Sequence, residues 1–505
     1  MIKLSWAIAA TAVIAVGGIF GSAGAASAVS GGTPQTSAWT VWGDNVWGAA
    51  GVGSTASQIT TPQSFTLPGG RTPASIVTGA DNGAAIATDG TVWTWGLNGT
   101  GALGTGSVRK PKTTSPVRVA LPSGVTMKQI AIGDTAMFAL DAAGHVWAWG
   151  DNGAGELGDG TLGTMSNPTP RQVKLPAGLT VTDIAAAVHG GFALTSTGVI
   201  YSWGSNEVGE LGNGSDSGDA DPTPTPVTAP HGVEFTSIST GGNAATATST
   251  DGTHYVWGDN LNGQLLLSDP SLQYTSTPQP IDNTTGKAFV RLEVGTVYSL
   301  GLTADGSIYA WGNNTDGELG NGTTNPSAPQ LSPVEVDAPT NVTFTGVTAG
   351  AFAAYATATD GTVYAWGAGG GSLLGDGGTD DVLKPTLVPL SEAYHVGALS
   401  YGTSTIAAQV NGTPPAFGTS GLARATVGQQ YSSTVAPAGP TTATFAVTAG
   451  ALPAGLRLDT STGSISGMPR RAGTHSFTIT ARNLVGSTTQ RFTIAVHPAD
   501  PRTGR

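Results

Sequence analysis

Apolar and polar residues alternate in short runs along most of the chain, and these runs recur at a fixed distance. A strand-like segment with alternating apolar positions ends in Trp-Gly seven times. The seven tryptophans are Trp42, Trp95, Trp149, Trp203, Trp257, Trp311 and Trp366. Successive pairs lie 53 to 55 residues apart over more than 300 residues, which chance does not produce. The pattern therefore predicts a repeat protein with units of about 54 residues.

The stretch before each Trp-Gly predicts two strands joined by a tight turn. An apolar run follows a small residue that lies sixteen positions upstream of the tryptophan: Gly79, Gly133, Ala187, Gly241, Gly295 and Gly350. The turn that ends this run is Asp-Gly in four units, as in Asp89-Gly90. Asp-Gly between apolar runs is a strong hairpin signal, and we expect both turn residues to adopt positive φ.

The strand that ends in Trp-Gly carries a second aromatic residue two positions earlier in six units. These residues are Trp93, Trp147, Tyr201, Tyr255, Tyr309 and Tyr364. Residues two apart in a strand share a face, so each unit presents two rings on one side. Burial of one such ring removes roughly 150–250 Å² from water, on the order of 4–6 kcal/mol before entropy costs. We therefore expect the repeat tryptophans to form the core.

A glycine-rich loop follows each Trp-Gly pair, as in WGDNGAGELGDG at 149–160. Its leucine is expected to insert into the core; the residues are Leu103, Leu157, Leu211 and Leu319. A proline-rich segment with alternating valines then predicts an outer strand, where an edge position can spare a hydrogen-bond donor. Each unit thus contains about four antiparallel strands, the content of one propeller blade.

The loop WGxNxxGELGxG, preceded by a small residue and a D-G-x-[VI]-[YW]-x-W strand, resembles the regulator-of-chromosome-condensation repeat. The resemblance covers roughly residues 38–412 and implies an all-β, seven-bladed β-propeller, which we place at residues 29–412. Ring closure follows from two half units: SAWTVWG at 37–43 lacks its upstream half, and VGALSYGTSTIAAQVNG at 396–412 lacks a Trp-Gly strand. We expect the N- and C-terminal strands to pair and complete one blade, which removes exposed sheet edges.

The period stops after residue 412. Residues 413–422 read as a Pro/Gly linker, residues 423–498 as a small β-sandwich and residues 499–505 as a tail. The stretch ALPAGLRLDTSTGSISGMPRRAGTHSFTITARN closely resembles immunoglobulin-like (cadherin-like) modules of bacterial surface and secreted proteins. Such modules serve as spacers, stalks or adhesion units. Asp459 stands alone among acids there, so we expect no calcium site.

The N-terminal 28 residues have the pattern of a secretory signal peptide. Lys3 precedes an apolar run from Leu4 to Phe20, and cleavage is expected after Ala28, with Ala25 as the competing position. An uncleaved membrane anchor is the alternative, although the run is short for spanning a bilayer. No later segment is long and apolar enough to span. We therefore expect a secreted, extracellular protein, in one interpretation associated with the cell wall.

Charge divides the chain into two parts. The formal net charge is −12, but residues 413–505 carry eight arginines and two acids. The remainder is therefore strongly acidic, which argues against a nucleic-acid partner. The arginines favour an anionic surface or simply solubilise the module. There are no cysteines, which excludes a disulfide framework and a thiol nucleophile.

No catalytic, cofactor-binding or metal-binding constellation emerges from the sequence. The seven histidines are scattered, the glycine loops lack the Lys-Ser/Thr of a phosphate-binding loop, and no serine nucleophile elbow is present. Loops such as NNTDGELG lack the acid spacing of a calcium loop. We predict no enzymatic activity and no cofactor.

Three loops depart from the repeat. WGDNVWGAAGVG carries Trp47 where no other copy has an aromatic residue, WGDNLNGQLLLSD loses its glycines, and WGAGGGSLLGDG has Gly369 in place of asparagine. In a repeat protein, a departure from the pattern marks either a position where the usual structural residue has been lost or a functional face. Trp47, together with Trp39, is the best candidate for a contact residue.

Three functions compete. The first is a monomeric, non-catalytic binding or adhesion module whose propeller face holds a protein or a cell-surface glycan. The second is an enzyme inhibitor similar to propeller-type β-lactamase inhibitory proteins, although loop tips of Gly, Asn and Asp are poor binding hot spots. The third is guanine-nucleotide exchange, as in the family's namesake. Its repeat histidine is matched here only by His189.

Overall fold

The computed structural model describes residues 36–499 except 164–165, 216, 393 and 439–442. The predicted signal peptide and nearly all of the predicted tail lie outside the described residues. The chain divides into two compact units. The larger contains Trp39–Glu392 and Val396–Gln409, and the smaller contains, of the described residues, 36–38, 394–395 and those from Val410 onward. In the described part, no helix is long and apolar enough to cross a membrane.

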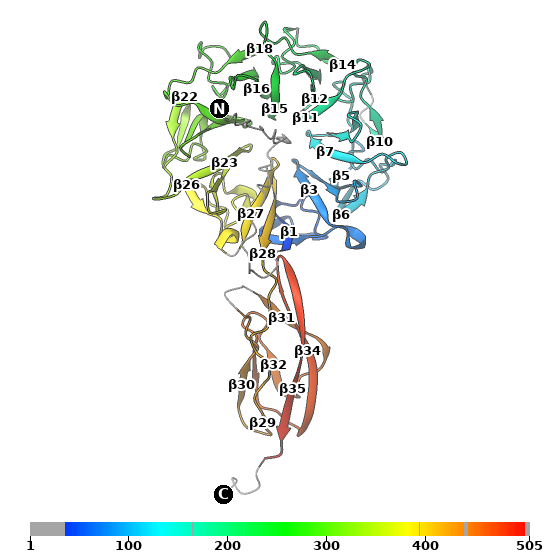
Figure 1. Ribbon diagram of the computed structural model, residues 1–505, viewed down its shortest axis with the longest axis vertical. Coiled ribbons are helices and arrows are strands. Elements are labelled where there is room, and N and C mark those ends of the chain that lie inside the picture. Colours follow the sequence, from blue (N-terminus) through cyan, green and yellow to red (C-terminus); the bar gives the residue numbers. More distant parts are fainter. Residues whose placement is uncertain (1–35, 164–165, 216, 393, 439–442, 500–505) are drawn as a thin grey trace, which may run out of the picture. The chain divides into compact units, whose positions relative to one another are not determined.

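The larger unit is a ring of seven four-stranded antiparallel sheets, which confirms the predicted propeller (Figure 1). In six blades the strands run from the inner to the outer edge in chain order. Blade 1 contains β3 (Pro73–Thr78), β4 (Asn82–Ala87), β5 (Val92–Leu97) and β6 (Lys112–Arg118). Blade 2 contains β7 (Met127–Ile132), β8 (Ala136–Asp141), β9 (Val146–Gly150) and β10 (Asn167–Gln172). Blade 3 contains β11 (Val181–Ala187), β12 (Gly190–Thr195), β13 (Ile200–Gly204) and β14 (Asp221–Pro226).

The next three blades repeat this order. Blade 4 contains β15 (Phe235–Gly241), β16 (Ala244–Ser249), β17 (His254–Asp259) and β18 (Tyr274–Pro280). Blade 5 contains β19 (Phe289–Val294), β20 (Tyr298–Thr303), β21 (Ile308–Asn314) and β22 (Asn325–Glu335). Blade 6 contains β23 (Phe344–Ala349), β24 (Ala353–Ala358), β25 (Val363–Gly367) and β26 (Val382–Leu387). Three short 3-10 turns, η1 (Pro68–Gly70), η2 (Gly370–Ser372) and η3 (Pro389–Glu392), lie in connections. The prolines of the outer strands occupy blade edges, as predicted.

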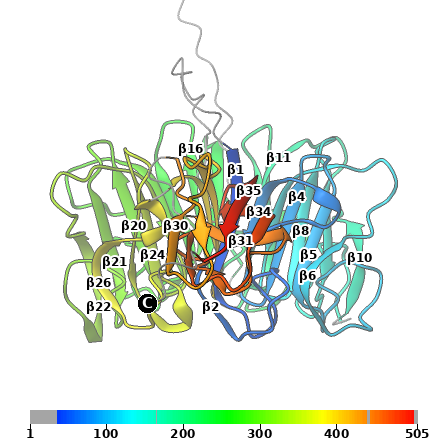
Figure 2. The ribbon, with the colours of Figure 1, turned by 90° about the horizontal axis from the view of Figure 1, so that it is seen from below.

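Blade 7 closes the ring with strands from both ends of the propeller sequence. Its order is β2-β1-β28-β27, where β27 (His395–Tyr401) and β28 (Thr405–Gly412) meet β1 (Thr36–Asp44) and β2 (Gln58–Phe65). This is the closure that the two half units predict. Figure 2 shows the blades from the side, with their strands running between the two faces of the ring.

The hairpin turns differ from the prediction that both Asp and Gly adopt positive φ. In blade 1, Gly90 has φ 76°, whereas Asp89 does not have positive φ. The amide of Gly90 donates to the Ala87 carbonyl at 2.8 Å, and the amide of Ala87 donates to the Thr91 carbonyl at 2.9 Å. The loop therefore has three residues: a type I turn followed by one glycine in the left-handed region. Asp89 instead accepts from the Thr91 amide at 3.0 Å, which fixes the turn.

All seven repeat tryptophans are fully buried, as expected. Their indole nitrogens form a repeated series of hydrogen bonds that the sequence did not predict. Each Nε1 donates to a main-chain carbonyl in the Trp-Gly loop of the preceding blade, as Trp149 does to Ala102 at 2.8 Å and Trp203 to Glu156 at 2.8 Å. Every blade-to-blade junction thus combines a buried ring with a satisfied polar group. The four loop leucines are also buried, as predicted.

The smaller unit contains two sheets, with strand orders β29-β35-β34-β31 and β30-β33-β32. The strands are β29 (Ala425–Thr426), β30 (Tyr431–Thr434), β31 (Thr444–Gly450), β32 (Leu456–Leu458), β33 (Ser464–Gly467), β34 (Gly473–Asn483) and β35 (Gly486–His497). They enclose a core of buried apolar side chains that includes Phe445, Phe477 and Phe492. The segment expected to be a linker belongs partly to this core. Phe417 packs with its ring centroid 5.4 Å from that of Phe492, so the packed module begins before residue 423.

Candidate functional site

One face of the propeller gathers two sets of loops. The Trp-Gly loops start at or just after the end of the third strand of each blade and comprise the described residues of seven segments: 44–57, 97–111, 151–163 with 166, 205–215 with 217–220, 259–273, 313–324 and 368–381. The inner loops join the first two strands and comprise 80–81, 134–135, 188–189, 242–243, 296–297, 351–352 and 403–404. In every blade the first residue of the Trp-Gly loop donates its amide to an inner-loop carbonyl, as Asp44 does to Ser404 at 2.8 Å. These fourteen segments therefore form one surface, here called the loop face.

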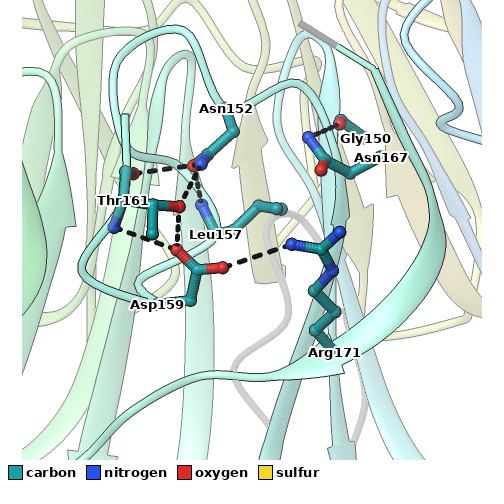
Figure 3. A network of polar contacts seen from close by, with 7 residues as sticks. All are labelled: Gly150, Asn152, Leu157, Asp159, Thr161, Asn167 and Arg171. Carbon is teal, nitrogen blue, oxygen red and sulfur yellow. Dashed lines mark hydrogen bonds and ion pairs between the residues drawn. The ribbon is translucent and has the colours of Figure 1, made fainter. Parts of the chain in front are cut away.

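A buried asparagine holds each of six Trp-Gly loops in shape. In blade 2, the Asn152 Oδ1 accepts from the Leu157 amide at 3.0 Å, and Nδ2 donates to the Thr161 carbonyl at 3.0 Å (Figure 3). Asp159 accepts from the Thr161 amide at 3.0 Å and lies 3.4 Å from Arg171 Nη1 (Figure 3). The same asparagine is Asn45, Asn98, Asn206, Asn260 and Asn314 in five other loops. The loops are thus presented on a fixed frame.

The structure separates the two tryptophans predicted to contact a partner. Trp39 lies in β1 with 3% of its surface exposed, so its ring is part of the core and is not available to a partner. Trp47 lies in the first Trp-Gly loop and is 41% exposed. Among the described tryptophans it is the exposed one. The correction for Trp39 follows from its position in a strand that pairs with β2 inside the closing blade.

Trp47 is held in place although it is exposed. Lys112, from the outer strand β6 of the next blade, places its Nζ 5.5 Å from the centroid of the indole ring. The same Nζ donates to the Val46 carbonyl at 3.2 Å. Val46 itself is 49% exposed, and Leu261, at the equivalent position of another Trp-Gly loop, is 60% exposed. The loop face therefore presents large apolar side chains at loop tips where most copies have glycine or small residues.

The loop face is strongly acidic. Its described segments contain two basic residues, Arg109 and Lys110. They contain sixteen acidic ones: Asp44, Asp81, Asp134, Asp151, Glu156, Asp159, Glu207, Glu210, Asp219, Asp259, Asp269, Asp316, Glu318, Asp376, Asp380 and Asp381. The whole chain has 32 acidic residues against 20 Lys and Arg, so half of the acids and a tenth of the bases lie in these segments, and Lys112 and Arg171 reach them from outer strands. This imbalance creates a negative field over one side of the propeller.

A cavity of about 410 Å³ opens at the centre of the loop face. Its lining includes the small residue that precedes each inner loop: Gly79, Gly133, Ala187, Gly241, Gly295, Gly350 and Gly402. These residues must be small because neighbouring blades meet at their positions. A Cβ on Gly402 would lie 2.4 Å from the Gly79 carbonyl oxygen, and one on Gly295 would lie 2.5 Å from that of Gly350. The small residues found in the sequence thus let seven inner strands converge around the cavity.

Several carboxyl groups on this face have raised pKa values. Burial, followed by repulsion from Asp134 and Asp44, raises the pKa of Asp81. Burial is also the main cause that raises the pKa of Glu156 and of Glu318. His189 lies beside Glu156, with 3.7 Å between Nδ1 and Oε1. A cation placed beside any of these carboxyl groups would therefore favour its charged form.

Within the described ranges, no group of three or more His, Asp or Glu side chains is arranged to hold a metal ion. The chemistry that the loop face offers is binding: a rigid frame, a few exposed apolar side chains, negative charge and a central cavity. Sequence reasoning singled out Trp47, which is exposed on this face, but did not predict that the acidic residues gather here. The signal was present in the Asp and Glu of each Trp-Gly loop, yet only the propeller brings these loops to one side.

A family model described as RCC1-like domain matches residues 38–408, and one described as Putative Ig domain matches residues 414–497. The E3 ubiquitin-protein ligase HERC2 of Homo sapiens is 29% identical over 381 residues, which are 75% of this chain and 8% of HERC2. The ultraviolet-B receptor UVR8 of Arabidopsis thaliana is 29% identical over 348 residues, 69% of this chain and 76% of UVR8. The chain thus spans a small fraction of the ligase and most of the receptor.

Solved propellers share the fold. Human WBSCR16 superposes with a TM-score of 0.66 at 21% identity, covering 74% of this chain and 99% of that one. Yeast RCC1 (Prp20), solved with Kap60 bound to it, gives 0.64 at 22% identity, covering 75% of this chain and 90% of that one. The family model, the closed ring and the seven buried Trp-Gly strands agree, and the chain belongs to the RCC1-like domain family.

Proposed function

We propose that this chain is an exported, non-catalytic binding module that holds a protein partner on the loop face of its propeller. The observation that carries the proposal is the exposed ring of Trp47, which Lys112 fixes on that face. A large aromatic side chain exposed on a rigid frame is the kind of residue that dominates binding energy at protein interfaces. Its ring loses little conformational freedom on binding, because the loop already holds it.

Two further observations support a protein as the partner. Val46 and Leu261 add exposed apolar surface at two loop tips of the same face, which suits a protein interface better than a polar sugar. The solved yeast relative, RCC1, binds the protein Kap60. Export rests on the N-terminal pattern of the sequence, and the Ig-like module fits a spacer or stalk.

Photo-crosslinking from position 47 tests the proposal. Full-length protein with a benzophenone amino acid at position 47 would be expressed in the source cells, and adducts would be identified by mass spectrometry. The matched control carries the same group at Val199, which is 39% exposed in a hairpin turn on the opposite face. We expect one protein adduct from position 47 and none from position 199. Unlabelled wild type should suppress it, whereas W47A should compete at least tenfold less well.

Three results would contradict parts of the proposal. Equal labelling from both positions would remove the loop face as the binding site, and an adduct with polysaccharide would replace the protein partner by a glycan. Retention of the chain in the cytosol, with an intact residue 1, would remove export. N-terminal sequencing of protein from the culture fluid should instead begin at residue 29.

A further inference from the structure

We propose that the central cavity of the loop face receives a lysine or arginine side chain of the partner, with its charge held at the mouth between Asp81 and Asp134. This inference rests on the proposed function, because it assigns the chemistry of the group that the partner inserts. It goes beyond Trp47, which lies in an outer loop, to a second contact at the propeller axis.

The shape and lining of the cavity suit a long side chain with a cationic end. Its volume of about 410 Å³ exceeds the volume of one arginine side chain. The wall is made largely of Gly and Ala main chain and side chains, and Phe352 stands at the rim with 40% of its surface exposed. Such a wall suits the methylene stem of Lys or Arg, whose charged end prefers polar groups.

The mouth carries carboxylates but no basic side chain among its lining residues. Asp134 lines the cavity and is exposed, and Asp81 is close enough for Asp134 to oppose its ionisation. No hydrogen bond involves the side chain of either aspartate in the described structure, so both are available to a donor from outside. Glu293 also lines the cavity, but Arg291 binds it at 2.7 Å, so it is already neutralised.

Tyr401 forms part of the cavity wall. Tyr401 is 7% exposed and lines the cavity, but its hydroxyl is fully buried and faces the main chain of residues 351–353 rather than the open space. The rim is also rigid: the Asp134 amide donates to the Val188 carbonyl at 3.1 Å, and the Val188 amide to the Gly242 carbonyl at 3.3 Å.

Binding of a fluorescent hexa-arginine peptide to the full chain tests this inference without knowledge of the partner. The test variant D81N/D134N removes the two charges at the mouth. The matched control E234Q/D282N removes two charges from connections on the opposite face. We expect the test variant to bind the peptide about tenfold more weakly and the control to change affinity less than twofold.

T403W supplies a steric test that leaves every charge in place. Thr403 is exposed and lines the cavity, so a tryptophan there should fill the mouth and reduce peptide affinity about as much as D81N/D134N does. Equal weakening in the test and control variants, or full binding by T403W, would overturn the cavity site and leave only a diffuse negative field. If crosslinking from position 47 fails while these variants behave as expected, the cavity stands and the Trp47 interface falls. If crosslinking from position 47 succeeds while these variants do not behave as expected, the Trp47 interface stands and the cavity site falls.

Discussion

The indole nitrogen of Trp42 donates a 2.9 Å hydrogen bond to the main-chain carbonyl of Leu373, 331 positions later in the chain. The same relationship joins the other six blade pairs, where the donor and acceptor lie 46 to 48 positions apart. The first and last repeats are therefore linked as consecutive repeats are. A closed ring needs this link between its first and last repeats, because each blade buries its apolar face only against a neighbouring blade.

Replacement of Trp42 by phenylalanine tests the closing junction. Tyr355 also donates its hydroxyl to the Leu373 carbonyl, so the acceptor keeps a partner and the cost comes mainly from lost ring volume. We expect W42F to lower the free energy of unfolding by about 1–3 kcal/mol, seen as a Tm lower by a few °C in thermal denaturation followed by circular dichroism. W149F, at an interior junction, should cost at least as much. A loss in W149F with none in W42F would show that the ring is not closed through this contact.

Deletion of residues 29–48 removes β1, so β28 keeps β27 on one side but has an unpaired edge on the other, and β2 loses its partner. An unpaired strand edge promotes aggregation, so we expect the shortened chain to lose soluble expression. Deletion of residues 29–35 alone, which leaves β1 whole, is the control and should fold. The measurement is size-exclusion chromatography followed by thermal denaturation. A monomeric, cooperatively melting product from the longer deletion would contradict the closure.

Ser372 occupies a position at which the other six loops have glycine. Its φ is 60°, it is fully buried, and its hydroxyl has no hydrogen-bond partner in the described structure. The equivalent glycines, such as Gly317 with φ 85°, adopt the left-handed region freely. We expect S372G to raise the free energy of unfolding by about 1 kcal/mol in denaturant titrations, because it removes strain and an unsatisfied group. G317S should lower it by a similar amount, and a destabilising S372G would refute the reasoning.

Asp183 predicts a dependence of stability on pH. Burial raises the pKa of this carboxyl to about 7, although the Gln129 Nε2 donates to its Oδ1 at 2.6 Å. The unfolded chain ionises this group near pH 3.9. The folded state therefore holds the proton more tightly. Its stability contribution is intact below pH 4 and is lost as the pH rises to 7, by up to about 4 kcal/mol.

The isosteric variant D183N cannot ionise and should not show this loss. We expect it to gain stability over wild type as the pH rises from 4.5 to 8, measured by denaturant unfolding at each pH. The control D251N changes an exposed aspartate in a hairpin turn and should show no rising gain over wild type in this range. Parallel curves for wild type and D183N would show that Asp183 does not titrate in the folded protein near neutral pH.

Most of the fold could be predicted from the sequence because every blade needs the same residue types at the same positions. Trp149 and its six counterparts recur at the spacing that one blade needs, and the small residues such as Gly133 recur where neighbouring blades converge. Two half units at the ends predicted the closure for the same reason. The type of hairpin turn could not be predicted in the same way, because Asp89-Gly90 is compatible with two turn types. The hydrogen bond between Ala87 and Thr91 in the structure selects the three-residue loop.

The sequence by itself determined the number of blades, the buried tryptophans, the order of the two domains and the unusual Trp47. Only the tertiary structure decided which exceptional residues are accessible. Trp39 and Trp47 look alike as departures from a repeat, but one lies inside a four-stranded sheet and the other at a loop tip. Likewise, acids that are dispersed between Asp44 and Asp381 become one negative surface because antiparallel strands return alternate connections to the same side. Local pattern sets each strand and turn, whereas proximity between distant loops exists only after the ring has closed.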